Sequence, residues 1–348
     1  MNRRDFFAAA SAVLALPLVS ARAESMRQTQ RLIKPNALRH GDTIGIITPS
    51  TEVIDPDRLA LATHTLKYFG LNPHLGKNVG KRAVTYADSV DARLDDLHEL
   101  FDDRSVKAVF ALRGGYGAGH LLDRIDYSLV RNNPKVFIGY SDITALHLAI
   151  YKHAGLVTFH GPVLTSRFTD YTQNSFRKAL FDAKSIGKLS NPEESNVLRP
   201  QHWLRTIKGG KVTAPLIGGN LSLILAMMGT PYEIDTKGKI LFIEDVGEQP
   251  YSIDRMLTSL RLAGKLEQAA GIIFGECAGC RPSDYKPSFS SPYSLGEVVD
   301  NILGGLKIPV LNGLTIGHTN DQLTLPLGVA ATLDADSGVL QINEAAVV

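Results

Sequence analysis

The sequence VFIGYSDITALHLAIYKH, residues 136–153, decides the fold class. Its first part, Val136–Tyr140, is mostly apolar and predicts a buried strand, whereas Ile143–His153 repeats apolar residues at the spacing of an amphipathic helix. A buried strand that passes directly into such a helix is the building unit of parallel sheets. We therefore expect an α/β protein.

The same alternation occurs earlier in the chain. The runs Thr43–Thr48 and Ala108–Leu112 predict buried strands, and Pro56–Phe69 and Val90–Phe101 predict amphipathic helices. This order predicts a mostly parallel sheet with helices on both faces. Ligands of such sheets bind outside the carboxyl ends of the strands, so the functional residues are expected there.

The pattern loosens after Gly161-Pro162, and residues 166–212 are polar and irregular. We therefore expect an amino-terminal lobe over residues 36–165, an irregular linker region over 166–212 and a second α/β lobe over 213–348. The elements expected in the second lobe are strands at Ile240–Asp245, Gly271–Phe274 and Val310–Leu311, helices at Leu221–Met228, Ile253–Leu262 and Leu295–Ile302, and a hairpin of Ala330–Leu333 with Val339–Ile342.

The start of the chain has the pattern of an export signal. Paired arginines, Arg3-Arg4, precede an apolar run that ends at Val19, and Ala21-Arg22-Ala23 offers a cleavage site. The paired arginines resemble a twin-arginine signal, and an ordinary secretory signal is the alternative. Either kind of signal over residues 1–23 predicts a periplasmic, exported protein. The apolar run of 14 residues is shorter than the ~20 that cross a bilayer, so no transmembrane segment is expected.

Composition excludes several kinds of partner. Of the 348 residues, 44% are hydrophobic and 21% charged, which is typical of a globular protein with a sizeable core. Removal of residues 1–23 takes away three arginines and one aspartate, which leaves 34 basic and 34 acidic residues. A neutral chain without basic runs has no electrostatic footprint for nucleic acid or anionic lipid. A small or neutral partner is expected instead.

Two cysteines, Cys277 and Cys280, form the motif Cys-Ala-Gly-Cys after an apolar run. A zinc site needs about four ligands, and no second Cys or His pair accompanies them. A redox motif normally opens a helix beside a thioredoxin-like pattern. The pair fits a local disulfide or two plain thiols better, and we assign no catalysis to it.

A glycine-rich turn, Arg113-Gly114-Gly115-Tyr116-Gly117, follows the strand expected at Ala108–Leu112. Glycines allow backbone N–H groups to approach a ligand closely or to adopt positive φ. The spacing is not that of a dinucleotide fingerprint, and a Walker phosphate loop is also absent. Either this is a tight turn with no ligand, or its amides stabilise an oxyanion.

Ser141 stands where the strand at Val136–Tyr140 meets the next helix. Serine is a preferred helix cap, which explains the residue without any catalysis. The same position places its hydroxyl beside N–H donors at a helix terminus, where an oxyanion can be held, and so makes Ser141 a candidate nucleophile. The motif is not Gly-x-Ser-x-Gly, because Ile143 replaces the second glycine.

A serine nucleophile needs a base and an orienting carboxylate. Of the ten histidines, His160 ends a strand, whereas His318 lies in a glycine-flanked loop after the strand at Val310–Leu311, which favours His318 as the base. Glu244 ends an otherwise apolar strand, and a charge buried there needs a partner. Its neighbours Asp245 and Glu248 are the competing carboxylates.

Taken together, the motifs resemble those of the LD-carboxypeptidase family of serine peptidases, which includes the microcin C immunity peptidases. Each motif is weak alone, but six occur in the family's order from about residue 36 to the end. They are Arg113-Gly114-Gly115-Tyr116-Gly117, Gly139-Tyr140-Ser141-Asp142, Thr158-Phe159-His160-Gly161-Pro162, Gly218-Gly219-Asn220-Leu221, Glu244-Asp245 with Arg255-Met256-Leu257, and Gly317-His318 with Leu325-Pro326-Leu327-Gly328.

The resemblance implies a fold and a mechanism. The fold is an amidotransferase-like parallel-sheet lobe followed by a swivelling α/β lobe, and the assembly is a homodimer. The implied triad is Ser141 as nucleophile, His318 as general base and then acid, and Glu244 holding the imidazole. The implied oxyanion hole uses the backbone N–H of Asp142 and of the Gly114-Gly115 turn. No metal or other cofactor is required.

The resemblance also implies a substrate, the murein tetrapeptide, cut between the L-centre of a diamino acid and the terminal D-alanine. Arg113 is then a candidate for pairing the terminal carboxylate, although a structural role at a strand end accounts for it equally well. An immunity-type or other amidase, or a periplasmic binding protein without catalysis, stays open as an alternative. The carboxypeptidase and the immunity-type amidase would differ in the loops that shape the pocket, and Trp203, in the irregular 166–212 stretch, is the aromatic candidate there.

Overall fold

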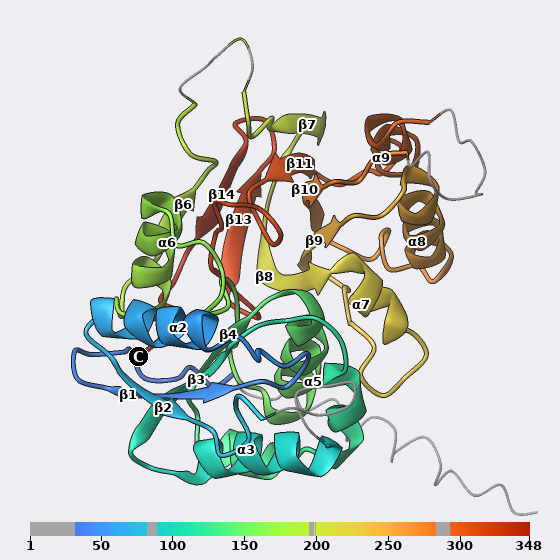
Figure 1. Ribbon diagram of the computed structural model, residues 1–348. Helices are drawn as coiled ribbons and strands as arrows, with labels where there is room; N and C mark the ends of the chain where they lie inside the picture. The colour runs from blue at the N-terminus through green and yellow to red at the C-terminus, as the bar shows by residue number, and fades with distance from the viewer. Residues whose placement is uncertain (1–31, 82–88, 195–197, 199, 283–292) are drawn as a thin grey trace, which may run out of the picture. The chain divides into compact units, whose positions relative to one another are not determined.

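Two mixed sheets carry the fold of the computed structural model, which describes residues 32–81, 89–194, 198, 200–282 and 293–348. The signal peptide expected over residues 1–23 lies outside these ranges. Among the described residues the first sheet has six strands in the order β12-β5-β4-β3-β1-β2, of which Figure 1 labels β1 to β4. All neighbours are parallel except β12 and β5. The strands are β1 (Thr43–Ile47), β2 (Asn72–Leu75), β3 (Val106–Ala111), β4 (Val136–Gly139), β5 (Phe159–His160) and β12 (Leu325–Pro326).

Helices cover both faces of this sheet, as α2 and α3 show in Figure 1. Local sequence sets their ends: Asp55 accepts a hydrogen bond from Asp57 N–H to cap α2, and α5 ends where Gly155 adopts a φ of 69°. The helices are α2 (Pro56–Tyr68), α3 (Val90–Asp102), α4 (Tyr127–Asn132), α5 (Thr144–Ala154) and the 3₁₀ helices η1 (Ala118–Arg124) and η2 (Ser141–Ile143).

The second sheet has eight strands among the described residues, in the order β6-β14-β13-β8-β9-β10-β11-β7. Its centre, from β8 to β11, is parallel, and the outer strands are antiparallel. The predicted α/β class, with a parallel amino-terminal sheet and a second sheet, is therefore confirmed. The elements are β6 (Gly187–Leu189), β7 (Arg205–Lys208), β8 (Lys211–Asn220), β9 (Ile240–Val246), β10 (Gly271–Ala278), β11 (Val310–Leu314), β13 (Ala330–Asp334), β14 (Val339–Ile342), α7 (Leu221–Ala226), α8 (Pro250–Leu262) and α9 (Leu295–Leu303).

The stretch 166–212 is more regular than its polar sequence indicates. It contains α6 (Asp170–Leu180) as well as β6 and β7, the two edge strands of the second sheet. Thr169 caps α6 by accepting a hydrogen bond from Thr172 N–H, and the helix buries Phe176, Ala179 and Leu180. Three apolar residues on one face are enough to dock this helix, although they leave the sequence polar on average.

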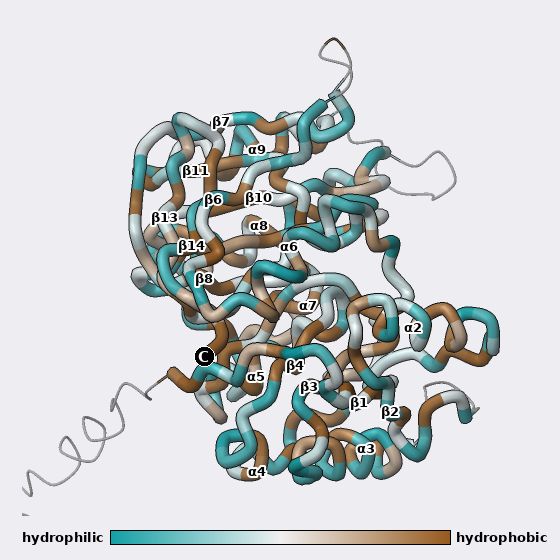
Figure 2. Tube along the Cα trace, turned by 90° about the vertical axis from the view of Figure 1, so that its left-hand side faces the viewer, coloured by the Kyte–Doolittle hydropathy of each residue, from teal (hydrophilic) through white to brown (hydrophobic). Residues whose placement is uncertain are grey.

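Residues 33–348 form one unit, and several contacts join its two sheets. β12 comes from the carboxy-terminal part of the chain but completes the first sheet beside β5. Asn220 N–H at the end of β8 donates to Thr144 Oγ1 at the start of α5, at 2.9 Å. The apolar chain end packs back as well, because Val348 exchanges backbone hydrogen bonds with Pro35 and Ala37 (Figure 2). The carboxyl ends of β4 and β8 thus lie near each other.

None of the helices in the described ranges combines the length and apolar character that a bilayer-spanning segment needs.

Candidate active site

Ser141 occupies a strained turn between β4 and η2. Its φ is 64°, and among the described residues it is the one non-glycine residue with positive φ. An L-residue in the left-handed region costs about 1–2 kcal/mol. Such strain persists when the surrounding structure imposes it, and it is common at functional sites.

Two glycines make room for this turn. A Cβ on Gly139 would lie 2.9 Å from the Ile143 side chain, and a Cβ on Gly114 would lie 2.9 Å from Ser141 Cβ. Gly115 has a φ of 121°, and a Cβ there would lie 2.1 Å from Thr51 Oγ1. The glycine-rich turn predicted from the sequence therefore lies directly against Ser141.

The side chain of Asp142 holds the serine turn in place through hydrogen bonds. It is 2% exposed, and its Oδ2 accepts hydrogen bonds from Ser50 Oγ at 2.5 Å and from Ala118 N–H at 2.8 Å. Burial raises the pKa of this carboxyl, and the hydrogen bonds from Ser50 and Ala118 oppose the rise. Asp142 thereby connects the serine turn to the loops after β1 and β3. The sequence pointed only to its backbone N–H, and this side-chain contact becomes apparent only in the structure.

Glu244 and His318 form a pair at the carboxyl end of the parallel strands of the second sheet. Glu244, in β9, is fully buried, and its Oε2 lies 2.7 Å from His318 Nδ1. The competing carboxylate Asp245 instead accepts hydrogen bonds from Ser222 and Asn220 at the start of α7. The geometry thus places Glu244, and not Asp245, beside the histidine that the loop position favoured.

Gly317 allows this pair to form. Its φ is 79°, and a Cβ built there would lie 2.0 Å from Glu244 Oε2. Only glycine fits both the backbone conformation and the close approach of the carboxylate. The sequence motif Gly317-His318 contained this signal, but the reason for the glycine appears only in the structure.

Gly317→Ala is expected to lower kcat about 100-fold, because the added methyl displaces Glu244 or the His318 loop by about an ångström. Gly229→Ala is the matched control, since Gly229 has a φ of 74° and open space around its Cβ position. Both variants should lose about 1 kcal/mol of folding stability from backbone strain. Steady-state kinetics and thermal unfolding of the two variants check this, and equal activity losses would contradict it.

The ring of Tyr140 connects the serine turn to the Glu244–His318 pair. It packs edge-on against the imidazole of His318, with centroids 4.9 Å apart. Within the described residues no hydrogen bond joins His318 to Ser141. Catalytic hydrogen bonds are often long in unliganded enzymes and tighten when substrate binds. Through Tyr140, the residue directly before Ser141, the structure brings both halves of the expected triad together.

Two further histidines lie buried beneath the turn. His147 Nε2 lies 2.8 Å from the Gly139 carbonyl oxygen, and burial lowers the pKa of His147 to about 4. His160 is fully buried, and among the described residues neither of its ring nitrogens has a hydrogen-bond partner. Burial, followed by His147 and His318, holds the pKa of His160 well below the usual range. Both rings are therefore neutral, and neither replaces His318 as the base.

Folding stability is expected to fall by about 2 kcal/mol from His147 alone between pH 7.5 and pH 5. The pKa of His147 is about 4 in the folded protein, against an ordinary value of 6.5 that applies to the unfolded chain. Within this window the unfolded chain binds a proton that the folded protein does not, so stability rises with pH. Urea unfolding at both pH values checks the slope. His147→Gln should flatten it, and an unchanged slope in that variant would refute the assignment.

A cavity of about 830 Å³ opens beside the catalytic candidates. Tyr140 and His318 line it on one side, and Arg167, His202 and Glu276 are among the residues on the others. Trp203, the aromatic candidate from the irregular stretch, is 70% exposed and does not belong to the described lining. The residue before it, His202, lines the cavity instead.

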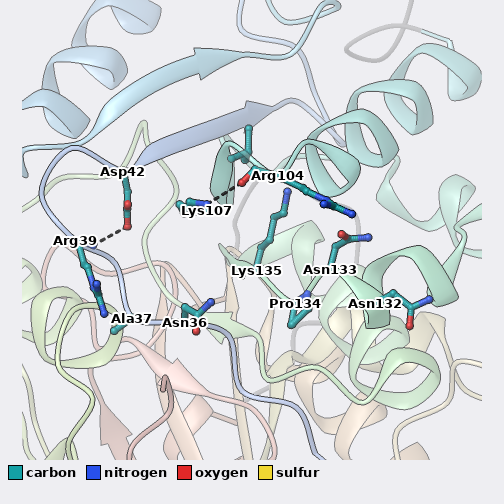
Figure 3. A pocket seen from close by; sticks show the side chains of 11 residues that line it. Asn36, Ala37, Arg39, Asp42, Arg104, Lys107, Asn132, Asn133, Pro134 and Lys135 are labelled. Atoms are coloured by element: carbon teal, nitrogen blue, oxygen red, sulfur yellow. Dashed lines mark hydrogen bonds between the residues drawn. The ribbon is translucent and has the colours of Figure 1, made fainter.

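A second cavity, of about 490 Å³, lies away from these residues, and Figure 3 shows the side chains that line it, among them Arg39, Asp42 and Lys135. Its lining includes Asp42 and Lys135, which directly precede β1 and β4, so it lies at the amino ends of these parallel strands. Lys135 donates hydrogen bonds to the carbonyl oxygens of Leu100 and Asp103, and burial lowers its pKa to about 8. None of the expected catalytic residues belongs to this lining, in keeping with ligand binding at the carboxyl ends of the strands.

The structure also places Arg113 and the cysteine pair that the sequence singled out. Arg113 is partly buried and follows β3 at the carboxyl end of the first sheet. Cys277 and Cys280 are joined by a disulfide at the end of β10, with their Cα atoms 5.4 Å apart. Of the alternatives left open for the cysteines, the structure has the local disulfide.

Family models for LD-carboxypeptidases match both halves of the chain. The model of the LD-carboxypeptidase N-terminal domain matches residues 44–161, and that of the C-terminal domain matches residues 213–333. The chain belongs to the LD-carboxypeptidase family. It is therefore a carboxypeptidase of the serine peptidase type, as the sequence motifs predicted.

Individual LD-carboxypeptidases and related proteins agree with this membership. The probable murein peptide carboxypeptidase of Bacillus subtilis is 42% identical over 301 residues, which cover 86% of this chain and 91% of the relative. The solved structure of the microcin C7 self immunity protein MccF has a TM-score of 0.81 at 30% identity, covering 91% of this chain and all of the other. A muramoyltetrapeptide carboxypeptidase from Oxalobacter formigenes has a TM-score of 0.75 at 32% identity, covering 87% and 99%.

Proposed function

We propose that this LD-carboxypeptidase hydrolyses the peptide bond before the terminal D-alanine of murein tetrapeptides with a triad of Ser141, His318 and Glu244. One observation carries the proposal: a fully buried glutamate holds the Nδ1 side of a histidine 2.7 Å away, beside a serine held at positive φ. Buried charges need partners, and a structural role alone does not explain a serine in this conformation.

Each residue has a defined part in this mechanism. Ser141 Oγ attacks the carbonyl carbon of the scissile amide while His318 Nε2 accepts its proton. The backbone N–H groups of Asp142 and Gly115 hold the tetrahedral oxyanion. His318 then protonates the leaving amine, D-alanine departs, and water hydrolyses the acyl-enzyme on Ser141. Glu244 keeps Nδ1–H of the imidazole pointed toward itself, so that Nε2 faces the serine.

We assign the terminal carboxylate of the substrate to Arg113, within the same proposal. A guanidinium matches a carboxylate with two parallel hydrogen bonds, and Arg113 begins the turn whose glycines lie against Ser141. A carboxypeptidase must recognise the free end of its substrate.

The purified mature chain should release D-alanine from murein tetrapeptide, with no release from the corresponding tripeptide. Mass spectrometry measures both products of the tetrapeptide, the released D-alanine and the remaining tripeptide. Tetrapeptide with a carboxamide in place of its terminal carboxylate is the control for end recognition, and it should react at least tenfold more slowly. Failure to release D-alanine from the free tetrapeptide would refute the substrate assignment.

A second candidate, an amidase of the immunity type, has one observation in its favour. The match to MccF, at a TM-score of 0.81, is higher than the match to the muramoyltetrapeptide carboxypeptidase, at 0.75. An aminoacyl sulfamoyl adenosine, of the kind named in a solved MccF complex, is the discriminating substrate. Faster turnover of that compound than of murein tetrapeptide would favour the second candidate.

We also propose that residues 1–23 direct export to the periplasm. The support is the sequence Arg3-Arg4 ahead of an apolar run and the cleavage motif that ends at Ala23. Expression of the full chain in a bacterium should yield a periplasmic protein that starts at Glu24. Replacement of both arginines by lysine should stop export by the twin-arginine route, whereas unaffected export would indicate the ordinary secretory route.

A further inference from the structure

The cavity beside His318 contains an imidazole clamped between two carboxylates. His202 Nδ1 lies 2.6 Å from Glu276 Oε1, and His202 Nε2 lies 3.3 Å from Asp321 Oδ2. All three side chains are partly buried, at 10%, 19% and 21% exposure for His202, Glu276 and Asp321. When both carboxylates are ionised, this group carries a net negative charge even with a protonated imidazole, and it lines a cavity large enough for a peptide side chain.

The carboxylate oxygens of Glu276 and Asp321 can accept further hydrogen bonds from a ligand in the cavity. Burial is the largest cause of the raised pKa of Glu276, and the hydrogen bond from His202 only partly offsets it. In the described part of the chain, Glu276 Oε2 has no hydrogen-bond donor. Asp321 Oδ1 accepts a hydrogen bond from Thr169 Oγ1, which leaves each oxygen of Asp321 with one donor.

Gln322 gives independent evidence for a missing donor. It is 3% exposed and lines the same cavity, and within the described ranges its buried Oε1 has no hydrogen-bond partner. Its amide orientation is fixed, because Nε2 donates to the carbonyl oxygens of Gly317 and Thr319. An acceptor buried without a donor is costly, so this position favours a ligand that brings N–H groups.

We propose that Glu276, Asp321 and Gln322 form a subsite for a primary ammonium group, the distal amine of the diamino acid that precedes the scissile bond. This inference rests on the proposed function and names the part of the substrate that the cavity selects. An ammonium has three donors and no acceptor, which matches a wall of carboxylate and amide oxygens. A cation also lowers the cost of keeping Glu276 ionised while it is buried.

The location fits this assignment. The cavity that holds the acceptor wall is also lined by Tyr140 and His318, so a side chain bound there belongs to a residue next to the reacting bond. An ammonium is favoured over a metal ion, because the described residues contain no cluster of three metal-ligating side chains suited to one. Arg167 lines the same cavity and is available to a carboxylate on the same diamino acid.

The test compares two tetrapeptides that differ only at the distal amine, which is free in one and N-acetylated in the other. Wild-type enzyme should show a kcat/KM at least about 30-fold higher on the free amine, since acetylation removes both charge and donors. Glu276→Gln should lower kcat/KM on the free-amine peptide about tenfold, mainly through a higher KM. The same variant should change kcat/KM on the acetylated peptide less than about twofold.

Two variants keep this test decisive. Asp321→Asn should reproduce the loss of discrimination if Glu276→Gln fails to fold, as judged by thermal unfolding. Glu267→Gln, at an exposed glutamate after α8, should retain wild-type discrimination. Equal wild-type rates on both peptides would overturn the ammonium subsite while D-alanine release upholds the proposed function. If neither peptide releases D-alanine, both the ammonium subsite and the proposed function are overturned.

Discussion

Ser141→Ala should lower kcat for D-alanine release about 10⁵-fold, because removal of the nucleophile leaves only the oxyanion donors and substrate binding to act on a water molecule. KM should change little, since the hydroxyl does not hold the peptide ends. Steady-state release assays with tetrapeptide measure both constants. Undiminished release by this variant would exclude Ser141 as the nucleophile.

The conformation of Ser141 supplies the control for this experiment. Alanine at a φ of 64° is as strained as serine, so Ser141→Ala should keep the wild-type unfolding temperature. Glycine adopts positive φ without that cost, and Ser141→Gly should raise the free energy of unfolding by about 1 kcal/mol while it abolishes activity. A gain in stability together with a loss of function would show that the strain is retained for catalysis. Destabilisation by Ser141→Gly would contradict this.

The parallel strands were predictable because their sequences differ sharply from the segments after them. β1, β4 and β9 are mostly apolar and mostly buried, and β3 departs from this pattern only at the exposed Lys107. The observed bounds therefore lie within a residue or two of the expected ones. Helices such as α2 and α5 followed from the helical spacing of their apolar residues.

Elements that depend on distant partners were not predictable. β12 has two residues and exists only because Leu325 and Pro326 pair with β5, more than 160 residues earlier. The edge strands β6 and β7 alternate weakly and have few apolar residues. Local sequence contributes little to such pairings, and tertiary contacts decide them.

The candidate site divides in the same way. Ser141, His318 and Glu244 could be proposed because each lies at or beyond the carboxyl end of an expected apolar strand and belongs to a motif of the family resemblance. The contacts of Asp142 and the His202–Glu276–Asp321 cluster could not, because the residues are 92, 74 and 119 positions apart from their partners. Without the fold, nothing in the sequence brings these residues together.

Glu244→Gln should lower kcat about 10³- to 10⁴-fold with a small effect on KM, by analogy with losses of the orienting carboxylate in other serine peptidases. The carboxylate now accepts from His318 Nδ1–H and so fixes the tautomer in which Nε2 can take the proton of Ser141. A glutamine of the same shape can instead present its NH₂ to Nδ1, and the opposite tautomer is then favoured. The negative charge that stabilises the imidazolium is also lost. Presteady-state release of D-alanine would show whether acylation is the slowed step.

Asp245→Asn is the matched control, because Asp245 is the next residue of β9 and is also buried, at 3% exposure. Its carboxylate accepts hydrogen bonds from Ser222 and Asn220 at the start of α7. Its replacement should therefore cost about 1–2 kcal/mol of folding stability and leave kcat within a few-fold of wild type. Two adjacent carboxylates on one strand would then have separable roles, one in orienting the base and one in capping a helix. Equal losses of kcat in both variants would mean that Glu244 acts only through the packing of β9, and the triad would need another carboxylate.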